Sequence, residues 1–362
     1  MKKRFFATKK LSDSQAKILH LLLSMSIFFT TIPFTLSGCK STSTEPITKS
    51  GFYFNTVISV TIYDSSKEAL LDDCFDMAAK YENYFSTTIA DSDIAKINAA
   101  LGAPVEVHDE TIELLQLGIK YGAISNGTFD ITIGTLSDLW DISTKSLIDE
   151  SEINASYIPD DAKIDEALAT VDYQNIVIDG NMVSLKNPDS AIDLGGIAKG
   201  YIADKMKAYL NENGVTSGFI NLGGNFLALG PKPDGNAYKV GIQYPFAESG
   251  TSIAVVSVTD ETVVSSGIYE RYFKVEDMLY HHILDTSTGY PYQNNLLGVT
   301  IITTKSVDGD ALSTTCFALG LDDGMALIES MEGTEAIFIT DDYELHTSSG
   351  IGTTIPYQKQ YY

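Results

Sequence analysis

Residues 191–204, Ala-Ile-Asp-Leu-Gly-Gly-Ile-Ala-Lys-Gly-Tyr-Ile-Ala-Asp, combine a carboxylate, two adjacent glycines and a lysine at a predicted strand-to-helix turn. Asp193 ends the apolar segment, and the pair Gly195 and Gly196 forms the turn. Adjacent glycines let the backbone approach a ligand closely, and a helix N-terminus offers N–H groups to an anion. Lys199, in the first turn of the helix, opposes the helix dipole, and a bound anion would explain its position. The segment indicates either a phosphate-binding turn or an ordinary tight turn with a surface lysine.

A carboxylate and a hydroxyl stand four residues apart in residues 308–315, Asp-Gly-Asp-Ala-Leu-Ser-Thr-Thr. Asp310 and Thr314 share one face of a predicted helix, because residues i and i+4 are neighbours on a helix surface. Carboxylate and hydroxyl oxygens suit Mg²⁺, which also keeps water and phosphate oxygens as ligands. The segment therefore predicts a magnesium site. The alternative is a simple carboxylate at the helix N-terminus, from Asp308 or Asp310.

Two adjacent histidines, His281 and His282, lie on a predicted strand close to Asp285. Consecutive strand residues point to opposite faces, so one of the two is expected to face a pocket, and a metal clamp by both is disfavoured. A histidine near a carboxylate suits a general base, because the carboxylate orients the ring and matches its charge. We predict His282 as the base, oriented by Asp285. His281 is the alternative, and so is a histidine that only packs within the strand.

Two further segments are bounded or interrupted by glycines. Residues 127–134, Gly-Thr-Phe-Asp-Ile-Thr-Ile-Gly, place Phe129 and Asp130 in a loop that could enclose a flat ring. The alternative is a helix-to-strand connection with a phenylalanine in the core. Residues 221–225, Asn-Leu-Gly-Gly-Asn, predict a kink between strands that belongs to the site or is only a bulge or hairpin turn.

The elements that must position these residues follow from hydrophobic periodicity. Helices are predicted over 67–85, 93–100, 109–126, 197–213, 310–319 and 325–329. Strands are predicted over 52–63, 176–178, 182–185, 218–222, 225–229, 238–243, 253–258, 262–265, 269–275, 279–284, 299–304 and 335–340. Residues 141–165 are polar and irregular. Strands at short spacing beside separate helices predict an α+β fold with mixed, mainly antiparallel sheets and packed helices.

The first 39 residues are typical of a targeting segment. Six basic residues precede an uncharged, apolar run over residues 18–36, and the run ends in Leu-Ser-Gly-Cys. This pattern resembles a bacterial lipoprotein signal, in which cleavage leaves Cys39 as a lipidated N-terminus. We predict a signal peptide over 1–38, the lipidated cysteine with a flexible tether over 39–50, and the folded domain over 51–362. The protein would then be held at the cell membrane on its extracytoplasmic side, and an uncleaved transmembrane anchor is the alternative.

The composition is strongly acidic, with 24 basic and 48 acidic residues in 362. Residues 1–38 hold six of the basic residues and one acidic residue, which leaves a net charge of −29 on the remainder. Such a surface argues against binding of nucleic acid and against adsorption to anionic lipid. Apart from Cys39, the cysteines are Cys74 and Cys316. Both stand in apolar helical patterns and are predicted to be buried thiols rather than a disulfide.

Taken in order, six segments together resemble the ApbE family of FAD:protein FMN transferases, many of which are membrane lipoproteins. They are Gly-Thr-Phe-Asp-Ile-Thr, Asp-Leu-Gly-Gly-Ile-Ala-Lys-Gly-Tyr, Asn-Leu-Gly-Gly-Asn, Ser-Ser-Gly-Ile-Tyr-Glu-Arg-Tyr, His-His-Ile-Leu-Asp-x-x-Thr-Gly-Tyr-Pro and Asp-Ala-Leu-Ser-Thr. The resemblance runs from about Phe52 to Ile339. It implies an ApbE-like, T-fold-related architecture. It also implies an enzyme that cleaves FAD with Mg²⁺, attaches FMN through a phosphoester to a Thr or Ser hydroxyl of a target protein, and releases AMP.

The resemblance also implies roles for individual residues, carried over motif by motif. The flavin nucleotide would contact Thr128, Phe129, Asp130, Asp193, Lys199 and Leu284. Magnesium would be held by the backbone oxygen of Gly196, the carboxylate of Asp310 and the hydroxyl of Thr314. Phe54 stands where the family often has Met of Met-Gly-Thr, and it is assigned to the flavin site on that basis. The segment after Asp285 reads Thr-Ser-Thr-Gly where the family usually has Pro-x-Thr-Gly.

Two other classes of protein fit parts of the sequence. One is an FAD-binding lipoprotein without transferase activity, such as a flavin carrier. The other is a solute-binding lipoprotein, favoured by the tether and the acidic surface. The pair Asp310 and Thr314 favours the transferase over the carrier, because a passive carrier has no need to polarise a pyrophosphate.

Overall fold

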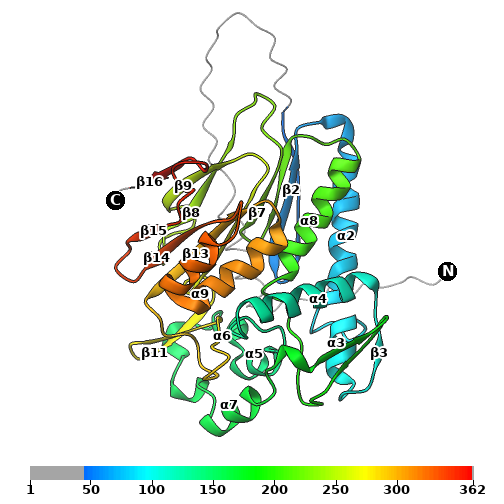
Figure 1. The fold of residues 1–362 in the computed structure, drawn as a ribbon, viewed down its shortest axis with the longest axis vertical. Helices are drawn as coiled ribbons and strands as arrows, with labels where there is room; N and C mark the ends of the chain where they lie inside the picture. Colours follow the sequence, from blue (N-terminus) through cyan, green and yellow to red (C-terminus); the bar gives the residue numbers. More distant parts are fainter. Residues whose placement is uncertain (1–44, 361–362) are drawn as a thin grey trace, which may run out of the picture. The chain divides into compact units, whose positions relative to one another are not determined.

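An eight-stranded antiparallel sheet organises the computed structural model, which describes residues 45–360 (Figure 1). The strands run in the order β1 (Ile47–Tyr53), β2 (Thr56–Ile62), β6 (Gly218–Leu222), β7 (Asn225–Leu229), β10 (Thr262–Gly267), β13 (Leu296–Thr303), β14 (Glu335–Thr340) and β15 (Leu345–Thr347). All eight residues of β13 are buried, so both faces of the sheet are covered at its centre. Ile301 packs into the core on one face, and Ile302 packs into a second core on the other.

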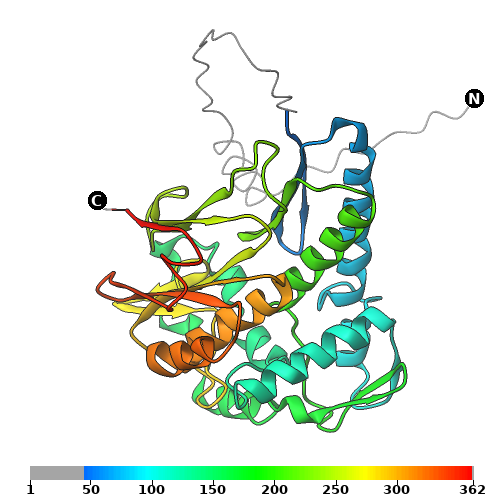
Figure 2. The ribbon, with the colours of Figure 1, turned by 45° about the horizontal axis from the view of Figure 1, so that its top comes forward.

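Three long helices cover the first of these faces. They are α2 (Ala69–Phe85), α8 (Ala198–Glu212) and α9 (Ser306–Glu329). In both views α2 and α8 lie side by side, and α9 packs against α8 and β13 (Figure 2). Gly320 interrupts α9 with a φ of 80°, which explains why the sequence predicts two helices here. The apolar length of α9 would suffice to cross a membrane, but 44% of that window is buried within the protein.

A smaller antiparallel sheet covers the second face. It contains β8 (Tyr238–Gln243), β9 (Ser252–Val258) and β16 (Tyr357–Lys359). Val256 of β9 shares its apolar core with Ile302 and Ile339 of the large sheet. Sheet packs on sheet at this point because alternate residues of each strand face inward.

A mostly helical region adjoins the large sheet. Its helices are α3 (Asp93–Ala99), α4 (Asp109–Ile124), α5 (Gly134–Trp140), α6 (Ile142–Lys145) and α7 (Asp161–Leu168). Single-turn 3₁₀ helices span Glu150–Glu152, Ala155–Tyr157 and Tyr173–Asn175, and another, Ser65–Lys67, lies between β2 and α2. Its strands form a three-stranded sheet of β3 (Val105–Glu106), β5 (Met182–Leu185) and β4 (Ile176–Asp179), and a hairpin of β11 (Tyr272–Val275) and β12 (Met278–His281). Trp140 is fully buried in this region and its Nε1 donates to Gly289 O at 2.7 Å.

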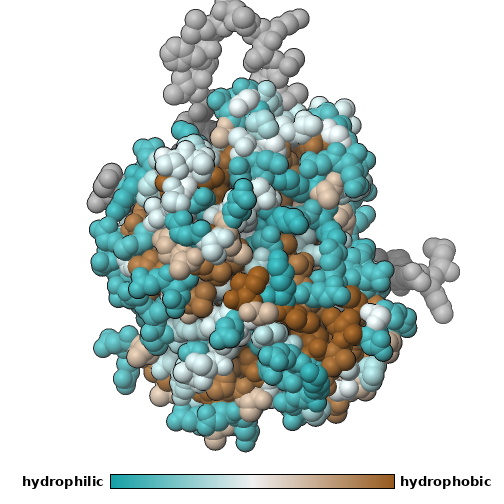
Figure 3. Space-filling model, viewed as in Figure 1, coloured by the Kyte–Doolittle hydropathy of each residue, from teal (hydrophilic) through white to brown (hydrophobic). Residues whose placement is uncertain are grey.

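The predicted α+β class with mainly antiparallel sheets is confirmed. Cys74 and Cys316 are free and buried, as predicted, and burial raises the pKa of each thiol to about 12. A buried thiol of this kind is unreactive. The visible surface is mostly hydrophilic, with an apolar area beside α3 and α4 (Figure 3).

The N-terminal boundary of the folded part differs from the prediction. The tether was expected to extend to residue 50, but β1 begins at Ile47 and pairs with β2 in register from Ile47 opposite Ile62. The single strand predicted over 52–63 is a hairpin, because Phe54 and Asn55 adopt left-handed φ values of 53° and 55° and reverse the chain. The predicted signal peptide over 1–38 and Cys39 lie outside the described residues.

Close packing of α8 against α9 depends on Gly200. A Cβ added there would overlap the carbonyl oxygen of Ser306 and lie 2.7 Å from Val307 Cα, both in the backbone of α9. A Gly200→Ala variant is therefore expected to unfold at lower denaturant concentration, with a loss on the order of 1–3 kcal/mol. Asn211→Ala, on the exposed surface of the same helix, is the control and should leave the midpoint nearly unchanged. Equal stability of the Gly200→Ala variant would contradict the packing described here.

Candidate active site

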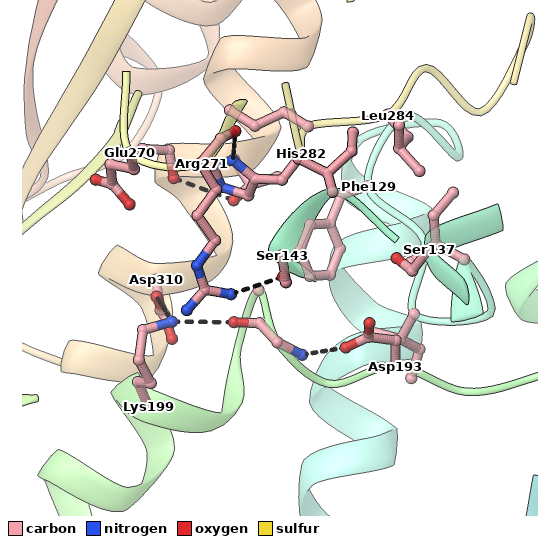
Figure 4. Close-up of a pocket in the computed structure, with 18 of the residues that line it drawn as sticks. Phe129, Ser137, Ser143, Asp193, Lys199, Glu270, Arg271, His282, Leu284 and Asp310 are labelled. Carbon is pink, nitrogen blue, oxygen red and sulfur yellow. Dashed lines mark hydrogen bonds and ion pairs between the residues drawn. The ribbon is translucent and has the colours of Figure 1, made fainter. Parts of the chain in front are cut away.

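A cavity of about 260 Å³ opens where the N-terminus of α8 faces α9, the end of β10 and the loops around α5 and α6 (Figure 4). The sequence-predicted residues that line it are Thr128, Phe129, Asp130, Asp193, Gly196, Lys199, His282, Leu284, Asp310 and Thr314. The structure thus brings together residues from all the segments to which sequence analysis gave roles. Two predicted residues, Phe54 and Asp285, do not line it.

The turn before α8 forms one wall of the cavity. Asp193 Oδ1 accepts a hydrogen bond from Gly195 N at 2.7 Å, which fixes the turn through a short side-chain-to-backbone contact. A Cβ at Gly196 would lie 3.1 Å from the ring of Phe129 and 3.8 Å from Thr314 Oγ1. The glycine therefore allows the backbone to approach the aromatic ring and the hydroxyl of α9 together.

Asp310 is the centre of the polar side of the cavity and is only 4% exposed. Its Oδ2 accepts from Gly200 N at 2.9 Å, and its Oδ1 lies 3.6 Å from Lys199 Nζ. Lys199 Nζ also donates to Gly195 O at 3.0 Å. One turn further along α9, the Thr314 hydroxyl lies 3.2 Å from the Ser266 hydroxyl. The α9 helix begins at Ser306, so Asp310 lies in its second turn rather than at the helix start.

The donor set around Asp310 fits a magnesium ion that is bound jointly with a substrate. Gly196, Asp310 and Thr314 offer oxygen atoms only, and no group of three His, Cys, Asp or Glu side chains occurs among the described residues. Mg²⁺ in proteins characteristically uses one or two carboxylates and completes its shell with water and substrate phosphate. The cavity also holds four carboxylates, from Asp130, Asp193, Glu270 and Asp310, against two basic side chains. A bound cation would therefore strengthen the binding of an anionic ligand by offsetting this negative charge.

The two adjacent histidines have separate environments. His281 ends β12, is 2% exposed, and its Nε2 lies 2.8 Å from Tyr292 O in the core. His282 lines the cavity, and its Nδ1 lies 3.3 Å from Arg271 O. A carbonyl oxygen only accepts, so Nδ1 carries the proton in the neutral ring and Nε2 keeps its lone pair. Burial, together with the charges of Arg271 and His281, lowers the pKa of His282 to about 3, so the ring is neutral near pH 7.

Asp285 does not orient His282 as sequence analysis predicted. Its carboxylate accepts from Ser287 N at 2.7 Å, from Ser287 Oγ at 2.6 Å and from Thr288 Oγ1 at 3.1 Å, all within its own turn. Within residues 45–360, no hydrogen bond joins Asp285 to His282. The backbone carbonyl of Arg271 takes that position instead, which corrects the prediction.

Phe54 is likewise outside the cavity. It lies in the turn between β1 and β2, where its ring packs beside Tyr53 and its backbone N donates to Glu82 Oε1 at 2.7 Å. The left-handed turn leaves the phenylalanine ring partly buried against the core, and Thr56 at the start of β2 lines the cavity. Phe54 thus does not line the cavity, and its assignment to the flavin site stays a prediction.

An apolar wall stands opposite the polar side of the cavity. It is formed by Phe129, Ile131, Ile133, Trp140, Ile142, Ile283 and Leu284. Asp130, beside this wall, accepts from Thr132 N and Thr132 Oγ1 at 2.7 Å and from Tyr173 N at 2.7 Å. Burial raises the pKa of Asp130 although these hydrogen bonds oppose the shift. The Asp130 carboxylate thus holds the loop in place, and the apolar wall offers a surface for a flat ring.

Several lining residues received no role from sequence analysis. They are Thr56, Ser137, Ser143, Asn225, Ser266, Glu270 and Arg271. Glu270 and Arg271 lie in the turn between β10 and β11, within the segment Ser-Ser-Gly-Ile-Tyr-Glu-Arg-Tyr. The Glu270 side chain is exposed toward the cavity, where partial desolvation by the cavity walls raises its pKa to about 7 against the charges of Lys199 and Arg271. The sequence feature that could have identified these two residues is a charged pair in a short turn between strands.

Comparison with known proteins identifies the family of the chain. The ApbE family profile matches residues 54–338. A Klebsiella pneumoniae protein named FAD:protein FMN transferase is 36% identical over 288 residues, which cover 79% of this chain and 86% of that protein. One of the same name from Treponema pallidum is 32% identical over 316 residues, covering 82% and 85%. The crystal structure of an ApbE protein from Thermotoga maritima superposes with a TM-score of 0.75 at 28% identity, covering 84% and 97%. The chain therefore belongs to the ApbE family, as the order of its motifs predicts.

Proposed function

We propose that this chain is a flavin transferase that cleaves FAD, attaches FMN to a threonine or serine hydroxyl of a target protein, and releases AMP. The printed names of its relatives support flavin transfer. The proposal of FAD cleavage and FMN transfer rests on one observation. The side chains of Lys199, Asp310, Thr314 and His282 line a single cavity beside an apolar wall. Phosphoryl transfer needs positioning and neutralisation of charge, and these groups supply both.

The polar side of the cavity is proposed to hold the pyrophosphate of FAD. Gly196 through its carbonyl, Asp310 through its carboxylate and Thr314 through its hydroxyl would hold Mg²⁺, which when bound neutralises charge on the phosphate oxygens. Lys199, fixed between Gly195 O and Asp310, presents a second positive charge at the same place. The apolar wall around Phe129 receives the flavin ring.

His282 is proposed as the general base. Its Nε2 accepts the proton of the acceptor hydroxyl while the hydroxyl oxygen forms a bond to the phosphorus of the FMN half. The bond between that phosphorus and the bridging oxygen breaks, and the oxygen leaves with AMP. The Arg271 carbonyl at 3.3 Å from Nδ1 keeps the ring in the tautomer that leaves Nε2 free.

The proposal is tested by incubating the full chain with FAD, with and without Mg²⁺, and measuring AMP. We expect AMP release only with the metal. A flavin carrier would hold FAD and release no AMP, and a solute-binding lipoprotein would not bind FAD.

We further propose that the chain is a lipoprotein anchored at the cell membrane through Cys39, facing target proteins on the extracytoplasmic side. A Cys39→Ser variant is expected to lose its lipid anchor and leave the membrane fraction, because acyl chains contribute about 0.8 kcal/mol per buried CH₂. FAD binding should persist, since the cavity lies within residues 56–314. Fractionation followed by immunoblotting measures the change. Membrane association as tight as that of the parent would indicate a transmembrane anchor instead.

A further inference from the structure

We propose that Arg271 binds the pyrophosphate oxygens of FAD as a two-pronged clamp beside Lys199; this rests on the proposed function. The chain has only two arginines, Arg4 and Arg271, among its 24 basic residues. Arg271 is therefore the single arginine in the part of the chain that the structure describes. All other Lys or Arg positions within residues 45–360 are lysine. The arginine at position 271 therefore indicates a role for which the guanidinium group is required.

Arginine differs from lysine in having a planar fork of five N–H donors that matches two phosphate oxygens at once. The Arg271 side chain lines the cavity and extends toward Ser143 and Lys199 (Figure 4). One of its donors, Nη1, bonds the Ser143 hydroxyl of α6 at 3.2 Å. No other side-chain hydrogen bond of Arg271 occurs within residues 45–360, so most of the fork is available to a ligand.

The other basic group of the cavity is already engaged. Lys199 Nζ donates to Gly195 O and lies beside Asp310, so part of its charge is balanced within the protein. Among the described residues, Arg271 has only a neutral hydroxyl as a hydrogen-bond partner of its side chain. Burial lowers the pKa of His282 and raises that of Glu270; the Arg271 charge adds to the first shift and opposes the second, so Arg271 lies within reach of both groups. An anion entering between Lys199 and Arg271 would meet donors from two separate elements.

Binding measurements separate this role from a structural one. Affinities of the full chain in detergent are measured by titration calorimetry in EDTA, with FAD, ADP and riboflavin as probes. Arg271→Gln is expected to weaken FAD and ADP about 10- to 100-fold, as for loss of hydrogen bonds to a charged group. Riboflavin, which has no phosphate, should bind with unchanged affinity. Arg271→Lys keeps the charge but not the fork, and it should recover only part of the loss.

Lys163→Gln, which removes an exposed positive charge on α7, is the matched control and should not change any of the three affinities. Unchanged binding of FAD and ADP by Arg271→Gln, or full recovery by Arg271→Lys, would overturn the clamp. An equal loss for riboflavin would overturn it too, because it would indicate a structural role. If Arg271→Gln does not fold, Arg271→Lys decides alone: unchanged ADP affinity rejects the clamp. Failure of the parent chain to release AMP would refute the transferase and leave these binding results intact.

Discussion

Substitution of Asp310 by alanine is expected to abolish metal-dependent cleavage of FAD. Asp310 is the only charged member of the proposed magnesium set, and the other two, Gly196 and Thr314, are neutral oxygen donors. Removal of the carboxylate also frees Gly200 N and leaves Lys199 without its acidic partner. FAD should still bind through the apolar wall. The measurement is AMP released per enzyme at saturating FAD and increasing Mg²⁺.

The control for this experiment lies on the same helix. Asp322→Ala removes an exposed carboxylate from α9 and should leave AMP release at the level of the parent. A melting temperature close to that of the parent would show that Asp310→Ala is folded. Full AMP release by folded Asp310→Ala protein would refute the metal assignment.

Substitution of His282 by alanine is expected to slow transfer of FMN to protein by about 10²–10⁴-fold, the usual contribution of a general base. A threonine hydroxyl is a poor nucleophile near neutral pH, whereas binding of FAD requires no proton removal. The affinity for FAD should therefore stay nearly unchanged. Covalent flavin, detected by in-gel fluorescence after denaturation, measures the transfer.

His281→Ala is the matched variant, because the neighbouring side chain packs in the core and reaches Tyr292 O rather than the cavity. It should reduce stability and leave transfer by the folded fraction close to that of the parent. Loss of transfer in His281→Ala with normal transfer in His282→Ala would move the base by one residue. Normal transfer in both would exclude the histidines and make a cavity carboxylate such as Glu270 the next candidate.

Much of the fold follows from local patterns in the sequence. Alternating apolar residues predicted β6 and β7 with the bounds that the structure shows, Gly218–Leu222 and Asn225–Leu229. The helix predicted over 197–213 is α8 at Ala198–Glu212. These elements are delimited by glycines, which mark ends clearly. In contrast, the first four residues of β1 were assigned to the tether, because Ile47 and its neighbours become a strand only by pairing with β2.

The site was less predictable where the direction of a side chain decides its role. The order of the motifs predicted that Asp193, Lys199 and Asp310 belong to one site, and the structure places them in one cavity although they come from distant segments. Asp285 could not be placed this way, because its own turn supplies three donors that compete for the carboxylate. Arg271 was overlooked, since spacing in the sequence does not reveal that the β10–β11 turn faces the N-terminus of α8.

The most direct test of metal-dependent transfer of FMN uses the full chain with FAD, Mg²⁺ and a membrane fraction from cells of its host that lack this chain. Released AMP and covalent flavin on acceptor proteins are measured in the same samples. We predict both products in similar amounts with Mg²⁺, and neither with EDTA. Bound FAD that is fully recovered intact after denaturation, with no AMP and no covalent flavin, would contradict the proposed transferase.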